Sequence, residues 1–272
     1  RLIKKNYQKA CKVPSDLNAA IASTTTKAHS IWASARENED VTEYLPILAE
    51  IINLKRQKAE ALAEAGNCYD ALADEYEPRM STIDVSVMFE ELRPTLVGLR
   101  KEILAQDKIP SVTYDFDQNT QLNFARELAI TFGYDLNKGR IDLAIHPFSS
   151  GSGSDVRITT RIDPSDPFNC IYSTIHEVGH ATYEQNINKD YYFTPLGRGV
   201  SLGVHESQSR IFENQLGRSR AFTSWLFHRM RDLFGNFGIE DPETFYKYVN
   251  RVDSGCIRTE ADELQYNLHV ML

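Results

Sequence analysis

The sixteen residues from 171 to 186, IYSTIHEVGHATYEQN, restrict the fold most strongly because they predict one helix that is anchored in a core. Ile171, Ile175 and Val178 recur at helical spacing and predict the face that packs inward. His176 and His180 are four residues apart. On a helix they lie on the same face about one turn apart, so both can direct an imidazole nitrogen at one ion. We therefore expect a core helix that carries a pair of metal ligands.

The residues between the histidines add a candidate for proton transfer. Glu177 lies about 100° further round the helix than His176, where its carboxylate can reach a metal-bound water without binding the metal. Gly179 costs about 1 kcal/mol relative to alanine inside a helix, and we expect it to permit close packing beside the metal, with a neutral accident as the alternative. The pattern His-Glu-x-x-His is typical of zinc hydrolases but also arises by chance on ordinary helices. A third ligand would separate the two cases.

The segment GRGVSLGVHESQSRIFENQLG, residues 197 to 217, supplies a candidate third ligand. Its glycines predict a loop, and the residues from Ser201 to about Gln215 fit a helix. Catalytic zinc usually takes three protein ligands and a water, and Glu206 stands in this second helix, with 25 residues between it and His180. The alternative is a solvated Glu206 that pairs with Arg210 at i+4, a pairing worth only a few tenths of a kcal/mol.

This arrangement of motifs is similar to the carboxypeptidase Taq family of zinc metallocarboxypeptidases. The further matching segments are HPF at 146–148, DVRIT at 155–159, IRTEAD at 257–262 and DEYEP at 74–78. The resemblance implies a mainly α-helical, gluzincin-type metallopeptidase core with a small β-hairpin at the cleft. It also implies one zinc ion that cobalt can replace, and a homodimer.

The resemblance implies roles for individual residues. Zinc would be held by His176, His180 and Glu206, with Glu177 as the general base. The residues around the substrate would be Arg258, which would bind the α-carboxylate, and His146, Arg157, Asp155 and Thr159. For either arginine the alternative is a structural salt bridge, and Asp155 is close in sequence to Arg157.

Two residues are candidates for orienting the imidazoles through hydrogen bonds to the ring nitrogens that do not bind metal. These are Asp262 and His205. Asp262 could equally order the loop that carries Arg258, and the sequence does not separate these two roles.

The implied function is metal-dependent removal of C-terminal amino acids from peptides with a free C-terminus. One alternative is an oligopeptidase that uses the same zinc. Another is an inactive or partner-dependent metal-binding fragment, because further cleft residues of the family, including a G-x-x-Q-D-x-H-W motif, lie past the last residue of this chain. The chain begins without Met and ends on the helix-like ELQYNLHVML, so we expect a fragment truncated at both ends.

Composition agrees with a cytoplasmic enzyme. The 272 residues suffice for a substantial core, and the net charge of −8 argues against a nucleic-acid partner or an acidic membrane. No apolar run approaches the length of a membrane span. The four cysteines form no C-x-x-C pair, so we expect reduced thiols.

Outside the metal segment the sequence predicts helices over 15–36 and 42–65 and a long helix capped by Ser81. Two alternating segments, 141–145 and 156–161, predict a β-hairpin closed by a Gly/Ser turn. Its edge could pair with an extended peptide, or SGSGS could be only a flexible turn. We expect a single catalytic region, largely helical over 1–135, with the hairpin and the zinc-site helices in 136–272.

Overall fold

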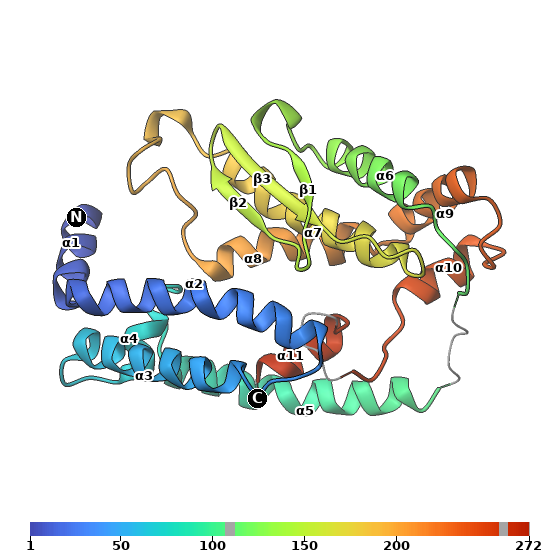
Figure 1. Cartoon of the computed structure of the whole chain (residues 1–272). Helices are drawn as coiled ribbons and strands as arrows, with labels where there is room; N and C mark the ends of the chain where they lie inside the picture. The colour runs from blue at the N-terminus through green and yellow to red at the C-terminus, as the bar shows by residue number, and fades with distance from the viewer. Residues whose placement is uncertain (107–111, 256–260, 272) are drawn as a thin grey trace. The chain divides into compact units, whose positions relative to one another are not determined.

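The computed structural model describes residues 1–106, 112–255 and 261–271 (Figure 1). The chain divides into two compact units, Arg1–Ser86 and Val87–Leu272. Helices dominate, and the strands that the structure describes form one three-stranded sheet. This confirms the predicted fold class, a mainly helical chain with a small β-element.

The first unit is helical throughout. It contains α1 (Leu2–Lys12), α2 (Ser15–Glu37), α3 (Tyr44–Ala63) and α4 (Cys68–Ala73). Helices α2 and α3 pack along each other, and α3 buries Leu54, Ala59 and Leu62. The predicted helices over 15–36 and 42–65 are thus confirmed to within two residues at each end.

A long helix, α5 (Thr82–Leu104), leads out of the first unit. It begins directly after Ser81, whose Oγ accepts a hydrogen bond of 3.2 Å from the backbone N–H of Asp84. Ser81 Oγ also donates to the Asp84 carboxylate at 2.6 Å. This satisfies one of the free N–H groups of the first turn, as the predicted cap requires.

The second unit holds the remaining helices and the sheet. Its elements are α6 (Gln118–Thr131), η1 (Leu136–Lys138), β1 (Ile141–Leu143), β2 (Ser149–Ser152), β3 (Asp155–Thr160), α7 (Pro167–Gln185), η2 (Lys189–Tyr191), α8 (Leu202–Arg210), η3 (Ile211–Leu216), α9 (Arg220–Phe234), α10 (Pro242–Val249) and α11 (Glu263–Val270). An Asp or Ser side chain caps the N-terminus of each of the six α-helices α6 to α11 by accepting a backbone N–H. Such caps fix where each helix begins.

The sheet corrects the predicted hairpin. The segments around 141–145 and 156–161 do pair, but β1 and β3 run parallel, with Ile141 opposite Ile158. The antiparallel partner of β3 is β2, formed by Ser149–Ser152, so the strand order is β1-β3-β2. The predicted hairpin between β1 and β3 was wrong because the chain reverses twice, before and after β2. Strand β2 consists of serine and glycine, which have little β-propensity, so the sequence predicted a turn at this position.

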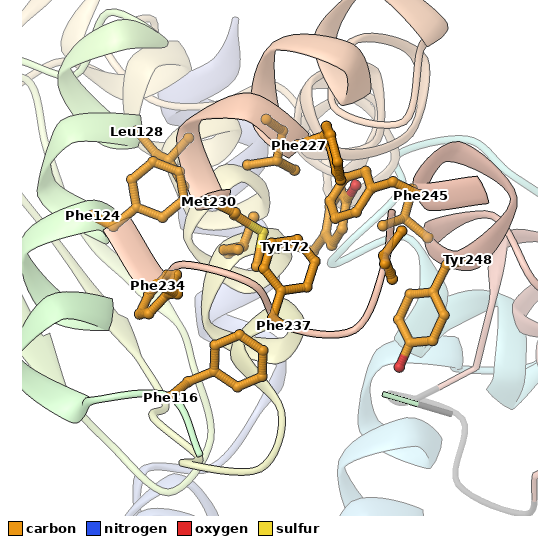
Figure 2. Packing of buried hydrophobic residues seen from close by; sticks show 14 of the residues in the cluster. Phe116, Phe124, Leu128, Tyr172, Phe227, Met230, Phe234, Phe237, Phe245 and Tyr248 are labelled. Atoms are coloured by element: carbon orange, nitrogen blue, oxygen red, sulfur yellow. The ribbon is translucent and has the colours of Figure 1, made fainter. Parts of the chain in front are cut away.

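Helix α7 joins two hydrophobic clusters of the second unit. On one side Ile171, Tyr172 and Ile175 pack into an aromatic core built mainly from α6, α9 and α10 (Figure 2). On the other side Val178 and Ala181 pack against the sheet. Figure 1 shows the three strands lying over α7. The helix is therefore held rigidly, and its remaining face carries the polar side chains described next.

Two predictions from composition can be compared with the structure. Cys11, Cys68 and Cys170 are free thiols, whereas Cys256 lies outside the described residues. Within the described ranges, no helix is both long enough and apolar enough to cross a membrane.

Candidate metal centre

Helix α7 positions the two histidines. Ile171, Ile175 and Val178 are all buried, which confirms the predicted core-facing stripe. The side chains of His176 and His180 retain about a fifth of their exposure, 20% and 18%. Their rings stand almost perpendicular, with centroids 5.0 Å apart. Both imidazoles therefore lie at an accessible surface of an otherwise buried helix.

Helix α8 lies close to α7 because Gly179 has no side chain. A Cβ atom at this position would lie 2.6 Å from Cα of Ser209 and 2.8 Å from the carbonyl oxygen of Gln208. Both are backbone atoms, which cannot rotate away. The expected role of Gly179, close packing beside the histidines, is therefore what the structure shows, and it places α8 within reach of them.

Glu206 of α8 meets both histidines. Its Oε2 lies 3.7 Å from Nε2 of His176 and 3.5 Å from Nε2 of His180. The three candidate ligand atoms all lie within 4.8 Å of one another. Ligand atoms placed about 2.0–2.2 Å from a tetrahedral zinc ion are roughly 3.3–3.6 Å apart. Two imidazoles and a carboxylate are also donors that zinc accepts, so these residues fit one metal ion.

The second oxygen of Glu206 is held by a cation. Oε1 accepts a hydrogen bond of 3.0 Å from Nε of Arg210, whose guanidinium stacks 3.9 Å from the centroid of the Tyr266 ring. The pairing of Glu206 with Arg210, which was the alternative to metal binding, therefore occurs through Oε1, while Oε2 faces the histidines. Burial alone would raise the pKa of Glu206. Hydrogen bonding to His180 and the charges of His176 and Arg210 outweigh burial, and the pKa is lowered to about 2. The carboxylate is therefore ionised and available as a ligand.

His176 is oriented by Glu213, a residue that the sequence did not suggest. Nδ1 of His176 lies 2.8 Å from Oε2 of Glu213. Burial raises the pKa of Glu213, yet its net pKa is lowered by the hydrogen bond and charge of His176 and by two arginines. An ionised Glu213 accepts the Nδ1 proton and leaves Nε2 free for a metal.

Glu213 reaches this position through an unusual turn. It lies in η3, where the chain winds as a π-helix immediately after α8. A single π-turn changes which residues share a face, and such turns are frequent at functional sites. The α-helical spacing read from the sequence could not place Glu213 here.

Glu177 is a buried carboxyl beside the ligands. It is 7% exposed, and burial raises its pKa to about 7. The charge of His176 opposes this rise, whereas those of Glu206 and Glu213 add to it. A carboxyl group that exchanges its proton near neutral pH suits general acid–base chemistry.

His205, a predicted partner of the imidazoles, lies against His180. The two Nδ1 atoms are 3.0 Å apart, and Nε2 of His205 lies 2.8 Å from Oε1 of Glu184. The other predicted partner, Asp262, is placed differently. It caps α11 by accepting hydrogen bonds from the backbone N–H groups of Leu264 and Gln265 at 3.0 and 2.9 Å. In the part of the chain that the structure describes, it contacts neither metal-site histidine.

Replacing Asp262 with alanine is expected to lower the free energy of unfolding by about 0.5–2 kcal/mol, because the first turn of α11 loses its cap. Metal affinity should be unchanged. Urea unfolding and zinc titration of the same variant measure both quantities. A marked loss of zinc affinity with little loss of stability would contradict the capping role and favour orientation of the imidazoles.

Three of the predicted substrate residues, Asp155, Arg157 and Thr159, lie in strand β3. Nε and one terminal guanidinium nitrogen of Arg157 donate to the two carboxylate oxygens of Asp155, both at 2.9 Å, in an exposed ion pair. Oγ1 of Thr159 accepts the backbone N–H of Phe148 at 2.9 Å and so fastens the start of β2. His146 is exposed in the loop between β1 and β2. Arg258 lies outside the described residues. The structure gathers the metal-site residues, and among the described residues no hydrogen bond or ion pair joins these four side chains to them.

Comparison with known proteins supports the resemblance inferred from the motifs. A family model described as carboxypeptidase Taq (M32) metallopeptidase matches residues 1–272. Thermostable carboxypeptidase 1 of Thermus thermophilus is 41% identical over 280 residues, which cover 98% of this chain and 55% of that protein. Thermostable carboxypeptidase 1 of Pyrococcus furiosus is 36% identical, covering 100% of this chain and 56% of that protein.

A solved structure agrees with these relatives. The crystal structure of the M32 carboxypeptidase from Deinococcus radiodurans R1 matches with a TM-score of 0.88 at 40% identity, over 98% of this chain and 55% of that one. The chain thus spans about half the length of the relatives it matches. On the strength of the family match over every residue, this chain belongs to the carboxypeptidase Taq (M32) family of metallopeptidases.

Proposed function

We propose that this chain is the metal-binding part of a zinc carboxypeptidase that removes C-terminal amino acids from peptides. The observation that carries the proposal is the approach of Oε2 of Glu206 to Nε2 of both histidines, at 3.7 and 3.5 Å, with a buried acid next to His176. His176, His180 and Glu206 are the proposed ligands. The same donors would accept cobalt, which binds such sites more weakly than zinc.

The chemistry follows from the roles of these residues. A zinc ion held by these three residues would supply a coordinated water of lowered pKa and would polarise the peptide carbonyl. Glu177 takes the proton from the attacking water on a carboxylate oxygen and passes it to the nitrogen of the departing amino acid. Its burial keeps bulk water from competing for that proton. Glu213 and Arg210 hold two of the ligands in place during these transfers.

Substrate binding is proposed for the remaining predicted residues, His146, Arg157, Asp155, Thr159 and Arg258. An arginine suits the free α-carboxylate because its planar guanidinium can bind both oxygens. Arg157 already holds a carboxylate in this way, namely that of Asp155, so it must exchange partners to bind substrate. This favours Arg258 as the carboxylate-binding residue.

The exposed edge of the sheet offers a second means of holding a peptide. Thr159 donates its N–H to the carbonyl of Phe148, which fixes the hydrogen-bonding pattern between β2 and β3. Every second residue of β2 then directs its backbone N–H and C=O at β3, whereas Ser149 and Gly151 direct theirs outward. An extended peptide could pair there regardless of its sequence. By analogy with the family we further propose a homodimer, and we propose separately that the protein acts in the cytoplasm.

Digestion of a peptide with a blocked N-terminus and a free C-terminus, followed by mass spectrometry with and without a chelator, tests the proposal. Stepwise loss of C-terminal residues that the chelator stops is the expected result. Internal cuts would indicate an oligopeptidase that uses the same metal. Bound zinc without cleavage would indicate a metal-binding part that needs other residues for activity.

A further inference from the structure

We propose that Glu184, acting through His205, fixes which nitrogen of His180 carries its proton and so keeps Nε2 of His180 free to bind metal. This inference rests on the proposed function, because it concerns the same metal site. Glu184 is a positioning residue in this account: it touches neither the metal ligand atom nor the substrate.

Three side chains form a continuous chain of hydrogen bonds. Oε1 of Glu184 lies 2.8 Å from Nε2 of His205, and Nδ1 of His205 lies 3.0 Å from Nδ1 of His180. On the far side of the His180 ring, Nε2 faces Oε2 of Glu206 at 3.5 Å. The chain therefore runs from a carboxylate, through one imidazole, to the back of a proposed ligand.

The order of the protons follows from what each group can donate. An ionised carboxylate only accepts, so Nε2 of His205 must carry a proton. With that single proton on its ring, His205 would have a lone pair on Nδ1 that accepts the Nδ1 proton of His180 across the 3.0 Å contact. His180 in turn keeps a lone pair on Nε2, the nitrogen that faces Glu206. The reverse order would place a proton on Nε2 of His180 and block its bond to a metal.

Within the described residues, the carboxylate of Glu184 has His205 as its hydrogen-bond partner. Its side chain is mostly buried, at 12% exposure, and Oε2 is buried with no hydrogen-bond partner among the described residues. His205 is thus the group to which this carboxylate is committed. His176 contacts its carboxylate, Glu213, directly, whereas His180 is linked to Glu184 only through His205.

The backbone is shaped around this pair. A Cβ atom on Gly199 would lie 2.6 Å from Cδ2 of His205 and 3.1 Å from Oε1 of Glu184. The ring of Tyr183 meets the ring of His205 edge-on, with centroids 4.9 Å apart. The loop before α8 and the end of α7 therefore enclose His205 on two sides. This enclosure limits rotation of the ring and keeps both nitrogens aimed at their partners.

Long-range ¹H–¹⁵N correlation spectra of histidine-labelled protein test the proton order directly, with and without zinc. We expect a proton on Nε2 but not on Nδ1 of His205, and a proton on Nδ1 of His180, in both samples. A proton on Nδ1 of His205, or a doubly protonated His205, would overturn the proposal. Because the metal-free sample decides the matter, failure to bind zinc would refute the proposed function without leaving this inference untested.

Zinc affinity, measured by competition with a chromophoric chelator, tests the consequence. Glu184→Met removes the acceptor of His205 and is expected to weaken zinc binding by up to about 10-fold, less than the roughly 10- to 100-fold usual for a direct partner of a metal-bound histidine. Glu184→Gln keeps an accepting oxygen and should lose less. Gly199→Ala, which displaces the His205 ring, should lose affinity although it alters no hydrogen-bonding group.

Asp190→Asn is the control, since Asp190 is an exposed carboxylate in η2, the short helix that follows α7. It should bind zinc as the unmodified protein does. Circular dichroism and thermal unfolding of each variant separate a lost fold from a lost hydrogen bond. Unchanged zinc affinity in a folded Glu184→Met variant would overturn the proposal.

Discussion

Replacing Glu177 with glutamine is expected to lower peptide turnover roughly 10²- to 10⁴-fold, the range for loss of a general acid–base group. Glutamine has nearly the same shape but cannot take up a proton. Glu177 is not among the three residues whose ligand atoms converge, so the variant should retain its metal. Turnover of a blocked peptide and zinc content per chain, measured on one preparation, check both halves of this expectation.

A matched carboxylate provides the control. Glu127 forms a surface ion pair with Arg229, at 2.7 and 2.8 Å, between α6 and α9. Glu127→Gln removes one charge just as Glu177→Gln does, and exposed pairs contribute at most about 1 kcal/mol. Its turnover should be unchanged. Near-normal turnover in Glu177→Gln, or loss of zinc from that variant, would contradict the assignment of Glu177 as the base.

Gly179→Ala is expected to damage both the fold and the metal site. The added Cβ would meet backbone atoms of Ser209 and Gln208 at 2.6 and 2.8 Å, where ordinary contacts begin near 3.4 Å. Overpacking of this kind costs about 1–3 kcal/mol of stability. Helices α7 and α8 must also move apart, and they carry the two sides of the metal site. A displacement of about 1 Å at a catalytic group can lower turnover 10²-fold.

Gly98 supplies the comparison, because it is also a helical glycine but has open space where a Cβ would stand. Gly98→Ala should leave zinc affinity unchanged and raise stability by up to about 1 kcal/mol, the difference in helix propensity. Urea unfolding and zinc competition on both variants test the pair. If Gly179→Ala bound zinc as tightly as Gly98→Ala, the close approach of α7 and α8 would not be what assembles the site.

The sequence predicted those features that depend on local spacing. The helical period of Ile171, Ile175 and Val178 identified the core face of α7, and the i+4 spacing of the histidines put both imidazoles on one side. Ser81 was recognised as a cap because capping is also local. Glu206 needed more, namely the expectation that a second helix returns against the first.

The features that were missed depend on how distant segments pack. Alternation of apolar residues shows that 141–145 and 156–161 are strands but not whether they run parallel, and β2 decides the direction. Glu213 reaches His176 only through the π-turn of η3. Glu184 stands four residues after His180, so its position on the histidine face was visible. Its link to His180 was not, because it requires His205 from the next helix.

The central claim is that His176, His180 and Glu206 hold one metal ion. Crystals of the zinc-loaded protein, with diffraction data collected on both sides of the zinc absorption edge, test it most directly. We expect one anomalous peak per chain, at bonding distance of about 2.0–2.2 Å from Nε2 of each histidine and from Oε2 of Glu206. A peak bound by other residues, or no peak in a fully ordered site, would contradict the claim.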